Sequence, residues 1–387
     1  MSIRLDALIA ERIRNAGPLT AAAFMELALY HPTLGYYTRA SKRTGRAGDF
    51  YTSVDVGPQF GALLAAQLDE MRRQLASPSF DLVEVAAGNG QLSRDILDAS
   101  AARYPELYEA LRVNLVETSP AARQVHADTL APHKAKLEAS TAVLPNTVTG
   151  VIFANELLDA LPTHAVTMTE TGLAENYVAL DGDRLVERLG PPSTPALASY
   201  LERLDLDLAP GWRGEICLSA MEWVRTAANR LHRGFMLLVD YGHTADRLYA
   251  GHHARGTLTT FTSHLVDAAS QSGEGPRGPA WLSEPGDRDI TAHVDITSVC
   301  DSARKAGLDL LGVVDQSRFL LGLGAVDESA MDHDPQAQLR HRLALKTLLV
   351  PGGLGSTHQV MLFGRGVGTP TLAGLSLSPS VQGKPSL

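Results

Sequence analysis

Short apolar runs alternate with helix-like stretches from residue 81 onward, and this alternation limits the possible folds more than any other feature of the chain. The expected strands are, in order, 81–85, 113–117, 150–154, 234–240, 308–315 and 358–364. The expected helices are 91–102, 120–130 and 155–161. Strands that alternate with helices are typical of a parallel sheet built from crossover units. We therefore expect an α/β fold with a mostly parallel sheet.

The chain of 387 residues also changes in composition along its length. Helix-like stretches precede the alternating region, and the link from 150–154 to 234–240 is too long for a simple crossover. We interpret this link as an insertion, a hairpin followed by two helices, over the carboxyl edge of the sheet. The expected parts are an N-terminal helical segment (1–78), a core (79–162 and 234–366), the insertion (163–233) and a disordered tail (367–387).

Charge and hydropathy exclude several classes of partner. The 34 basic residues are outnumbered by 43 acidic ones, which gives a net charge of −9. Such a chain has no general attraction for nucleic acid or for an anionic membrane surface. No apolar run reaches the ~18 residues that indicate a membrane span. Two cysteines are too few for a disulfide framework. We therefore expect no nucleic-acid partner and no membrane insertion.

A glycine-rich turn follows the first expected strand, in the segment DLVEVAAGNGQL at 81–92. Gly88 and Gly90 let the backbone pass close to a ligand, and the next helix points its free amides into the same space. The following strand ends in Glu117, where a carboxylate can accept hydrogen bonds from both hydroxyls of a ribose. An ordinary strand–helix connection is the unspecific alternative, but the pairing with Glu117 favours a nucleoside-bearing cofactor.

Two cofactor classes carry such a nucleoside, and the charge of Glu84 separates them. A dinucleotide site requires G-x-G-x-x-G beside a pyrophosphate, and here Ser93 holds the third glycine position. Glu84 lies four residues before Gly88, where it would repel a pyrophosphate. It suits the positive amino-acid end of S-adenosylmethionine (SAM). The sequence therefore favours SAM over a nicotinamide dinucleotide.

A second polar group follows the expected strand 150–154, in the segment GVIFANELLDALP. Asn155, Glu156 and Asp159 stand at the edge where open α/β sheets bind ligands. If 155–161 is a helix, both acids lie on one face and can hold a cationic nucleophile such as a guanidinium. The structural alternative is that Asn155 caps the helix and the acids favour its first turn. Beside a SAM pocket, we favour the functional interpretation.

Two other segments carry weaker signals. His243 ends the segment LLVDYGH, but its pairing with His252, His253, His264 or His293 shows no helical H-x-x-x-H spacing, so we expect no metal site. His293 and Asp295 share a face if extended, or are simply polar residues at the sheet edge. The segment 36–53 is basic and flanked by aromatic residues, and a solvated loop and a functional loop both fit it.

Together these segments resemble the family of the mitochondrial complex I assembly-factor methyltransferase and its bacterial relatives. The resemblance runs from about Gly17 to about Gly366. It rests on the ordered segments GPLTAAAFMELALYHPTLGYY, GDFYTSVDVGPQFG, LVEVAAGNGQL, LVETSPAAR, FANELLDALP, LLVDYGH, DITAHVDIT and PGGLG. It implies a class I SAM-dependent methyltransferase, with a Rossmann-like, seven-stranded, mostly parallel sheet. An N-terminal helical segment and an inserted substrate-side subdomain would complete the fold.

The resemblance also implies roles for single residues. The GDFYTS segment would close over the cofactor, and Asn155 and Glu156 would face the methyl acceptor. The expected cofactor-binding residues are Thr52, Ser53, Glu84, Ala86, Gly88, Gly90, Glu117, Thr118 and Asn155. The expected catalytic residues, which would orient a guanidinium for in-line attack, are Asp49, Glu156 and Asp159. The family usually has glycine at position 86, and Ala86 fits there only if it keeps a negative φ.

The implied activity is the formation of symmetric dimethylarginine on a subunit of the NADH:quinone oxidoreductase. Two alternatives from other classes stay open. One is a non-catalytic assembly chaperone that binds SAM as a structural ligand, and the other is a methyltransferase of small molecules. The basic loop and the large insertion favour a peptide-sized acceptor. Because no transit peptide opens the sequence, we expect a cytoplasmic bacterial protein.

Overall fold

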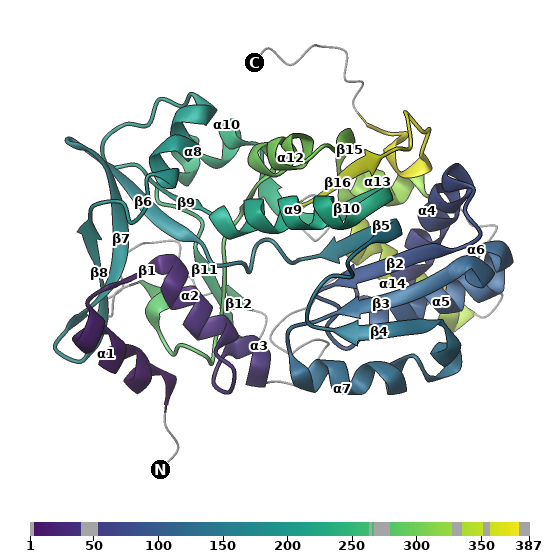
Figure 1. Cartoon of the computed structure of the whole chain (residues 1–387), viewed down its shortest axis with the longest axis horizontal. Coiled ribbons are helices and arrows are strands. Elements are labelled where there is room, and N and C mark those ends of the chain that lie inside the picture. The colour runs from purple at the N-terminus through teal and green to yellow at the C-terminus, as the bar shows by residue number, and fades with distance from the viewer. Residues whose placement is uncertain are drawn as a thin grey trace.

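A computed structural model describes residues 4–39, 53–262, 265–266, 279–326, 335–350 and 357–378 (Figure 1). Among these residues, the largest sheet has the strand order β15-β16-β10-β5-β2-β3-β4, and β14 (Val294–Asp295) pairs with the end of β10. Along this path only β16 is antiparallel to its neighbours. The strands are β2 (Phe80–Val85), β3 (Leu111–Val116), β4 (Leu137–Thr141), β5 (Val148–Asn155), β10 (Leu231–His243), β15 (Asp309–Asp315) and β16 (His358–Arg365). The expected seven-stranded, mostly parallel sheet is confirmed.

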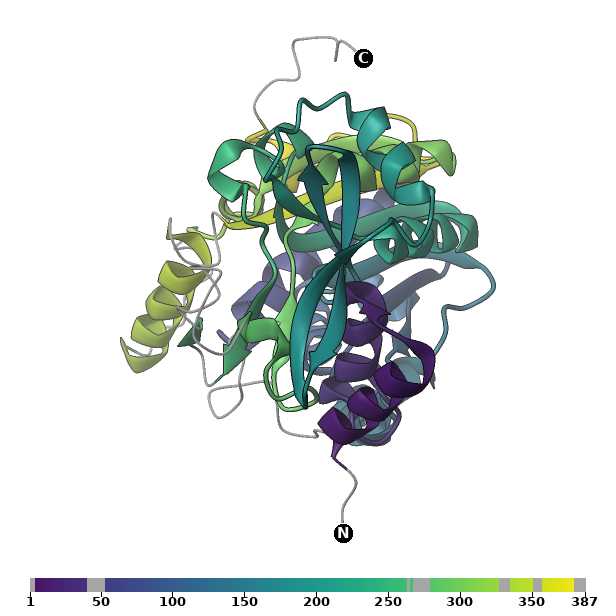
Figure 2. The ribbon, with the colours of Figure 1, turned by 90° about the vertical axis from the view of Figure 1, so that its left-hand side faces the viewer.

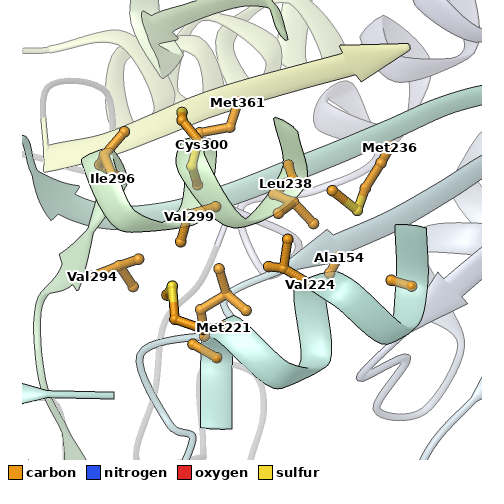
Figure 3. Close-up of a cluster of buried hydrophobic side chains, with 14 of the residues drawn as sticks. Ala154, Met221, Val224, Met236, Leu238, Val294, Ile296, Val299, Cys300 and Met361 are labelled. Atoms are coloured by element: carbon orange, nitrogen blue, oxygen red, sulfur yellow. The ribbon is translucent and has the colours of Figure 1, made fainter. Parts of the chain in front are cut away.

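Alternating residues of the central strands build two hydrophobic layers, one on each face of the sheet. On one face α4 (Gln59–Leu75) and α5 (Gln91–Arg103) pack on residues such as Phe153 of β5. On the other face α9 (Leu218–Arg230) and α12 (Ile296–Lys305) pack on residues such as Leu238 of β10 (Figure 3). Because both faces are covered, the strands read as continuous apolar runs.

The expected helix at 155–161 is wrong. Glu156 has φ +53, which ends the regular backbone directly after β5. The carboxylate of Asp240 at the end of β10 then accepts hydrogen bonds from the backbone N–H groups of Leu157 and Leu158, over 3.1 and 2.7 Å. These two amides are therefore held by the end of the neighbouring strand β10, in a turn that follows the left-handed backbone of Glu156. Because no helix begins at this position, Asn155 is not a helix cap.

A second sheet joins the N-terminal segment to the insertion (Figure 2). Leu19 and Thr20 pair with Val178 and Tyr177 of β7. The sheet strands are β1 (Leu19–Thr20), β6 (His164–Thr169), β7 (Gly172–Asp181), β8 (Arg184–Gly190) and β9 (Arg213–Ile216). The N-terminal helices α1 (Leu5–Ala16), α2 (Ala21–Tyr30) and α3 (Tyr36–Arg39) share a hydrophobic core with β6 and β7. Two segments far apart in sequence therefore fold as one unit beside the main sheet.

The remaining elements complete the described chain. The remaining helices are α6 (Pro105–Ala110), α7 (Pro120–Thr129), η1 (Ala131–Lys136), α8 (Ala196–Leu204), α10 (Ala245–Leu248), η2 (Gly251–His253), η3 (Ala280–Leu282), α13 (Gln316–Gly322), α14 (Pro335–Leu349) and η5 (Ala373–Leu375). A small sheet contains β11 (Thr259–Thr262), β12 (Leu265–Val266) and β13 (Asp289–Thr291). Within the described ranges, no helix is long and apolar enough to cross a membrane.

Ordered contacts continue into the segment that the sequence suggests as a disordered tail. The backbone amides of Ala373 and Gly374 donate to Glu70 and Gln67 of α4, over 2.9 and 3.1 Å. Leu372 is buried. The expected boundary at 366 is therefore too early, and the packed chain continues at least as far as η5.

Candidate active site

The glycine turn, residues 86–90, joins the buried strand β2 to helix α5. Gly88 and Gly90 both have positive φ, +53 and +81. A Cβ on Gly90 would lie 3.1 Å from Leu115 and 3.3 Å from Leu130, so this part of the turn is packed against the core. A Cβ on Gly88 would meet no atom within 4 Å. The turn therefore offers an open backbone surface at Gly88, the position where a ligand can approach closely.

Ala86 begins this turn with φ +55, so it does not keep the negative φ that an alanine would need to fit without strain. The turn needs the left-handed backbone at this position whichever residue occupies it. For an L-residue with a Cβ, that conformation costs about 1–2 kcal/mol. The Ala86 side chain is exposed, so the strain is local to the backbone.

Glu117 is fixed at the end of β3 beside the glycine turn. Its Oε2 accepts a hydrogen bond from the backbone N–H of Gly88 over 3.0 Å, and its Oε1 accepts one from Ser119 over 2.8 Å. Arg123 of α7 donates to the backbone oxygens of Glu117 and Thr118, over 2.6 and 2.8 Å. A carboxylate has about four lone-pair sites, so Glu117 keeps acceptor capacity for the hydroxyls of a ligand.

Glu84 lies beneath the turn, buried in the sheet. Its Oε2 accepts hydrogen bonds from the backbone N–H of Ser93, over 3.1 Å, and from the Ser93 hydroxyl. Burial raises the pKa of Glu84 to about 7, and the hydrogen bonds from Ser93 act in the opposite direction. Glu84 thus accepts a hydrogen bond from an otherwise unpaired amide in the first turn of α5, as a capping residue does.

His126 is a part of this site that sequence reasoning missed. It is fully buried in α7, and its Nε2 donates to the carbonyl oxygen of Gly88 over 2.8 Å. Its Nδ1 pairs with the hydroxyl of Ser140 over 2.8 Å. Burial lowers the pKa of His126, so the ring is neutral at pH 7 and holds the glycine turn from below. A lone histidine on a helix carries no local signal of such a contact.

The end of β5 forms the second half of the site. Val85 pairs with Ala154 in the sheet, which places Asn155 beside the glycine turn. Asn155 Nδ2 donates to Glu156 Oε1 over 3.2 Å. Its buried Oδ1 has no hydrogen-bond partner among the described residues. An orphaned buried acceptor is costly, so this atom is suited to receive a donor from a ligand.

Glu156 and Asp159 remain close neighbours although the expected helix is absent. The Glu156 carboxylate lies 3.4 Å from Nε2 of His358, a buried histidine of β16 that sequence reasoning also missed as a site residue. Asp159 Oδ2 accepts a hydrogen bond from the Tyr241 hydroxyl over 2.6 Å. Burial raises the pKa of Asp159 to about 7, and the charge of Glu156 adds to the shift. Within the described chain, Asp159 Oδ1 is buried without a partner.

Two tyrosines of the N-terminal segment reach this group of acids. The Tyr30 hydroxyl donates to the carbonyl oxygen of Ala160 over 3.0 Å, and the Tyr37 hydroxyl donates to Asp289 over 2.9 Å. Their ring centroids lie 5.5 Å apart. Burial raises the pKa of both hydroxyls, and nearby carboxylates add to the shift. Aromatic and acidic side chains therefore gather at the carboxyl end of β5.

The other predicted residues lie elsewhere or outside the described chain. Thr118 is exposed beside Glu117. Ser53 is buried, and its hydroxyl donates to Gln316 at the start of α13 over 3.1 Å. Asp49, Thr52 and most of the basic segment 36–53 are outside the residues that the structure describes.

Comparison with known proteins identifies the family to which this chain belongs. A family model described as "Putative S-adenosyl-L-methionine-dependent methyltransferase" matches residues 63–314. The chain belongs to this family. The sequence-based choice of SAM over a dinucleotide is confirmed, and the chain is a SAM-dependent methyltransferase.

Individual relatives match nearly the whole chain. The protein arginine methyltransferase NDUFAF7 of Mus musculus mitochondria is 30% identical over 341 residues, 81% of this chain and 72% of its own. The Danio rerio protein of the same name is 28% identical over 382 residues, 91% and 84% of the two chains. A Burkholderia thailandensis protein, crystallised with S-adenosyl-homocysteine, has a TM-score of 0.86 and 28% identity and covers 96% of this chain and 94% of its own.

The residues of the site fit the cofactor. The open face of Gly88 admits a ligand to the backbone, and the orphaned Oδ1 of Asn155 lies at the neighbouring strand end. The Glu117 carboxylate, fixed by two backbone amides, presents acceptors on the other side of the turn. Acceptor groups around an open glycine turn match a ligand that carries ribose hydroxyls and a cationic amino-acid end.

Proposed function

We propose that this methyltransferase modifies an arginine of a protein. The observation that carries the proposal is the buried Asp159, whose Oδ1 has no partner in the described chain, beside Glu156 at the end of β5. A guanidinium offers several N–H donors and a positive charge, and paired carboxylates are its preferred partners. The mitochondrial relatives at about 30% identity bear the name of protein arginine methyltransferases, which supports the same acceptor.

Under this proposal Glu117 accepts hydrogen bonds from the ribose, Gly88 gives the cofactor room, and Asn155 Oδ1 receives its amino group. Glu84 acts as a positioning residue, because it anchors the first turn of α5 through Ser93. When bound, SAM supplies an electrophilic methyl group on a sulfonium. The chain's own work is the placement of the acceptor nitrogen in line with that group.

Glu156 and Asp159 then have separate roles. Glu156 orients the guanidinium and is itself held by Asn155 and faced by His358. Asp159, with its pKa near 7, can take the proton that the guanidino nitrogen loses on methylation. The acceptor protein that the sequence resemblance implies is a subunit of the NADH:quinone oxidoreductase, with symmetric dimethylarginine as the product.

Replacing Glu156 by Gln tests the assignment, because it keeps the size and removes the charge. We expect transfer of a labelled methyl group to protein to fall about 100-fold or more, while binding of S-adenosyl-homocysteine stays as in the wild type. The exposed Glu138→Gln on β4 is the matched control and should leave both unchanged. Methyl transfer at the wild-type rate by E156Q would refute the role of Glu156.

A further inference from the structure

Three histidines from separate segments meet beyond Tyr241. His243 ends β10, His253 ends the short helix η2, and His293 lies between β13 and β14. Their ring centroids are 5.2, 5.4 and 5.7 Å apart, so the rings form a nearly equilateral triangle. One nitrogen from each ring lies within 4.8 Å of the other two.

The spacing of the rings matches a shared ligand. In a tetrahedral zinc site the metal–nitrogen bonds are about 2.0–2.1 Å long. With imidazole rings on such bonds, neighbouring ring centres stand roughly 5 Å apart. The three observed separations, 5.2, 5.4 and 5.7 Å, exceed this value by less than 1 Å. Three histidines with a fourth position open are also a known zinc-binding set.

The backbone holds two of these histidines in a defined relation. Gly242 pairs with Val294 across the parallel contact of β10 and β14, so His243 follows the paired residue on one strand and His293 precedes it on the other. A Cβ on Gly242 would lie 2.1 Å from the carbonyl oxygen of Val294, so only glycine permits the two strands to approach this closely. The backbone N–H of His293 donates to the Thr257 hydroxyl over 3.1 Å.

The chemistry of His293 also suits a metal ligand. Its Nδ1 is buried and has no hydrogen-bond partner among the described residues. Burial, with smaller contributions from His243 and His253, lowers the pKa of His293 to about 4, so the ring is neutral and keeps a lone pair. Neutral imidazole is the form that binds zinc and other first-row transition metals.

We propose that His243, His253 and His293 bind a divalent transition metal ion of the Zn²⁺ type, with the fourth position open to water or another ligand. The ion would tie the segment around η2 to the ends of β10 and β14. The site lies next to Glu156 and Asp159, because the Tyr241 ring is 5.6 Å from the His293 ring and the Tyr241 hydroxyl donates a hydrogen bond to Asp159. Helical H-x-x-x-H spacing applies only to ligands on one helix, whereas this cluster is assembled by the tertiary fold.

Binding of Co²⁺, a coloured substitute for Zn²⁺, tests the site directly. Protein without a histidine tag is freed of metal with a chelator and titrated with Co²⁺ alone. We expect one equivalent to bind and to give the intense visible absorption of four-coordinate Co²⁺. Replacing His243, His253 or His293 by Ala should each weaken binding at least about 10-fold, since loss of a ligand exceeds loss of an outer partner. The exposed His232→Ala at the start of β10 is the matched control and should bind as the wild type.

Binding of S-adenosyl-homocysteine shows whether each variant still folds. If a variant does not fold, the absorption spectrum of Co²⁺ bound to the wild type still tests the proposal. Wild-type protein that binds no Co²⁺, or binds it without the four-coordinate spectrum, overturns the proposal. Unchanged affinity in folded H243A, H253A and H293A variants also overturns it. No methyl acceptor enters the measurement, so its outcome is independent of the proposed arginine specificity.

Discussion

At the scale of the residue, the site depends on buried polar atoms whose hydrogen-bond partners come from other elements of the fold. Glu84 accepts a hydrogen bond from the amide of Ser93, and His126 donates one to the carbonyl oxygen of Gly88. Asp240 accepts from the amides of Leu157 and Leu158. Two acceptors, Asn155 Oδ1 and Asp159 Oδ1, have no such partner among the described residues. Because buried polar groups are nearly always paired, these two atoms mark where ligands are expected.

Ala86 has a strained backbone in the glycine turn, because its φ is positive. Replacing Ala86 by Gly removes the penalty of the positive φ, about 1–2 kcal/mol, from the folded state. Glycine also has more conformational freedom in the unfolded chain, and this offsets about 0.4–1 kcal/mol of the gain. We expect A86G to raise the free energy of unfolding by about 0.5–1 kcal/mol in urea denaturation. Ala87→Gly is the control, since Ala87 is buried without a positive φ and its replacement should destabilise. A less stable A86G protein would contradict the strain.

The raised pKa of Asp159 predicts that the stability of the folded protein depends on pH. Its folded-state pKa is raised by burial from 3.8 to about 7, so between these values the folded protein holds a proton that the unfolded chain has lost. Stability from this group is therefore present at low pH and is lost as pH rises toward 7. Glu84 shifts in the same direction, so the comparison must isolate Asp159.

Asp159→Asn provides that comparison. Urea unfolding of wild type and D159N at pH 5 and pH 7 should show that the wild type loses more stability over this interval than the variant. Equal losses in the two proteins would show that Asp159 does not keep its proton.

At the scale of the element, the strands and most helices follow from local pattern. The glycine turn and the alternation of apolar runs with helices are visible within a few residues, and β2, β3, β5, β10, α5 and α7 form where expected. The segment after β5 could not be predicted in this way. Its conformation depends on the left-handed backbone of Glu156 and on Asp240, more than eighty residues later in the chain, which accepts hydrogen bonds from the amides of Leu157 and Leu158.

Other functional features escaped prediction for the same reason. The positive φ of Ala86 is imposed by the turn as a whole, and the contact between His358 and Glu156 depends on the antiparallel strand β16. The three-histidine cluster joins segments that no sequence spacing relates.

Replacing Asp240 by Ala tests the turn after β5. Its carboxylate accepts from three backbone amides, those of Leu157, Leu158 and Tyr241. Their loss leaves buried donors unpaired, so we expect D240A to lower the free energy of unfolding by about 1–3 kcal/mol or more. The exposed Asp207→Ala should change stability by less than about 0.5 kcal/mol. Wild-type stability in D240A, measured by urea denaturation, would show that the carboxylate does not hold the turn.

At the scale of the whole molecule, the main sheet carries the residues of the candidate site at its carboxyl edge, and a second sheet folds beside it. The N-terminal segment joins the insertion through β1 and β7, and the same segment carries Tyr30 and Tyr37 to the end of β5. Under the proposed function, these parts of the chain outside the core sheet would receive the acceptor. This arrangement suits a large acceptor such as a protein segment, and it surrounds Glu156 and Asp159 with aromatic side chains.

The central claim is that the chain methylates a protein arginine, and the fate of the methyl group tests it most directly. The protein is incubated with SAM labelled in the methyl group and with an extract of bacterial cells, and the product is separated into protein and small-molecule fractions. We predict label in protein, recovered as methylated arginine after hydrolysis. Label confined to small molecules, or in another amino acid, would contradict the claim. Bound SAM with no labelled product would also contradict it and favour a chaperone that binds SAM as a structural ligand.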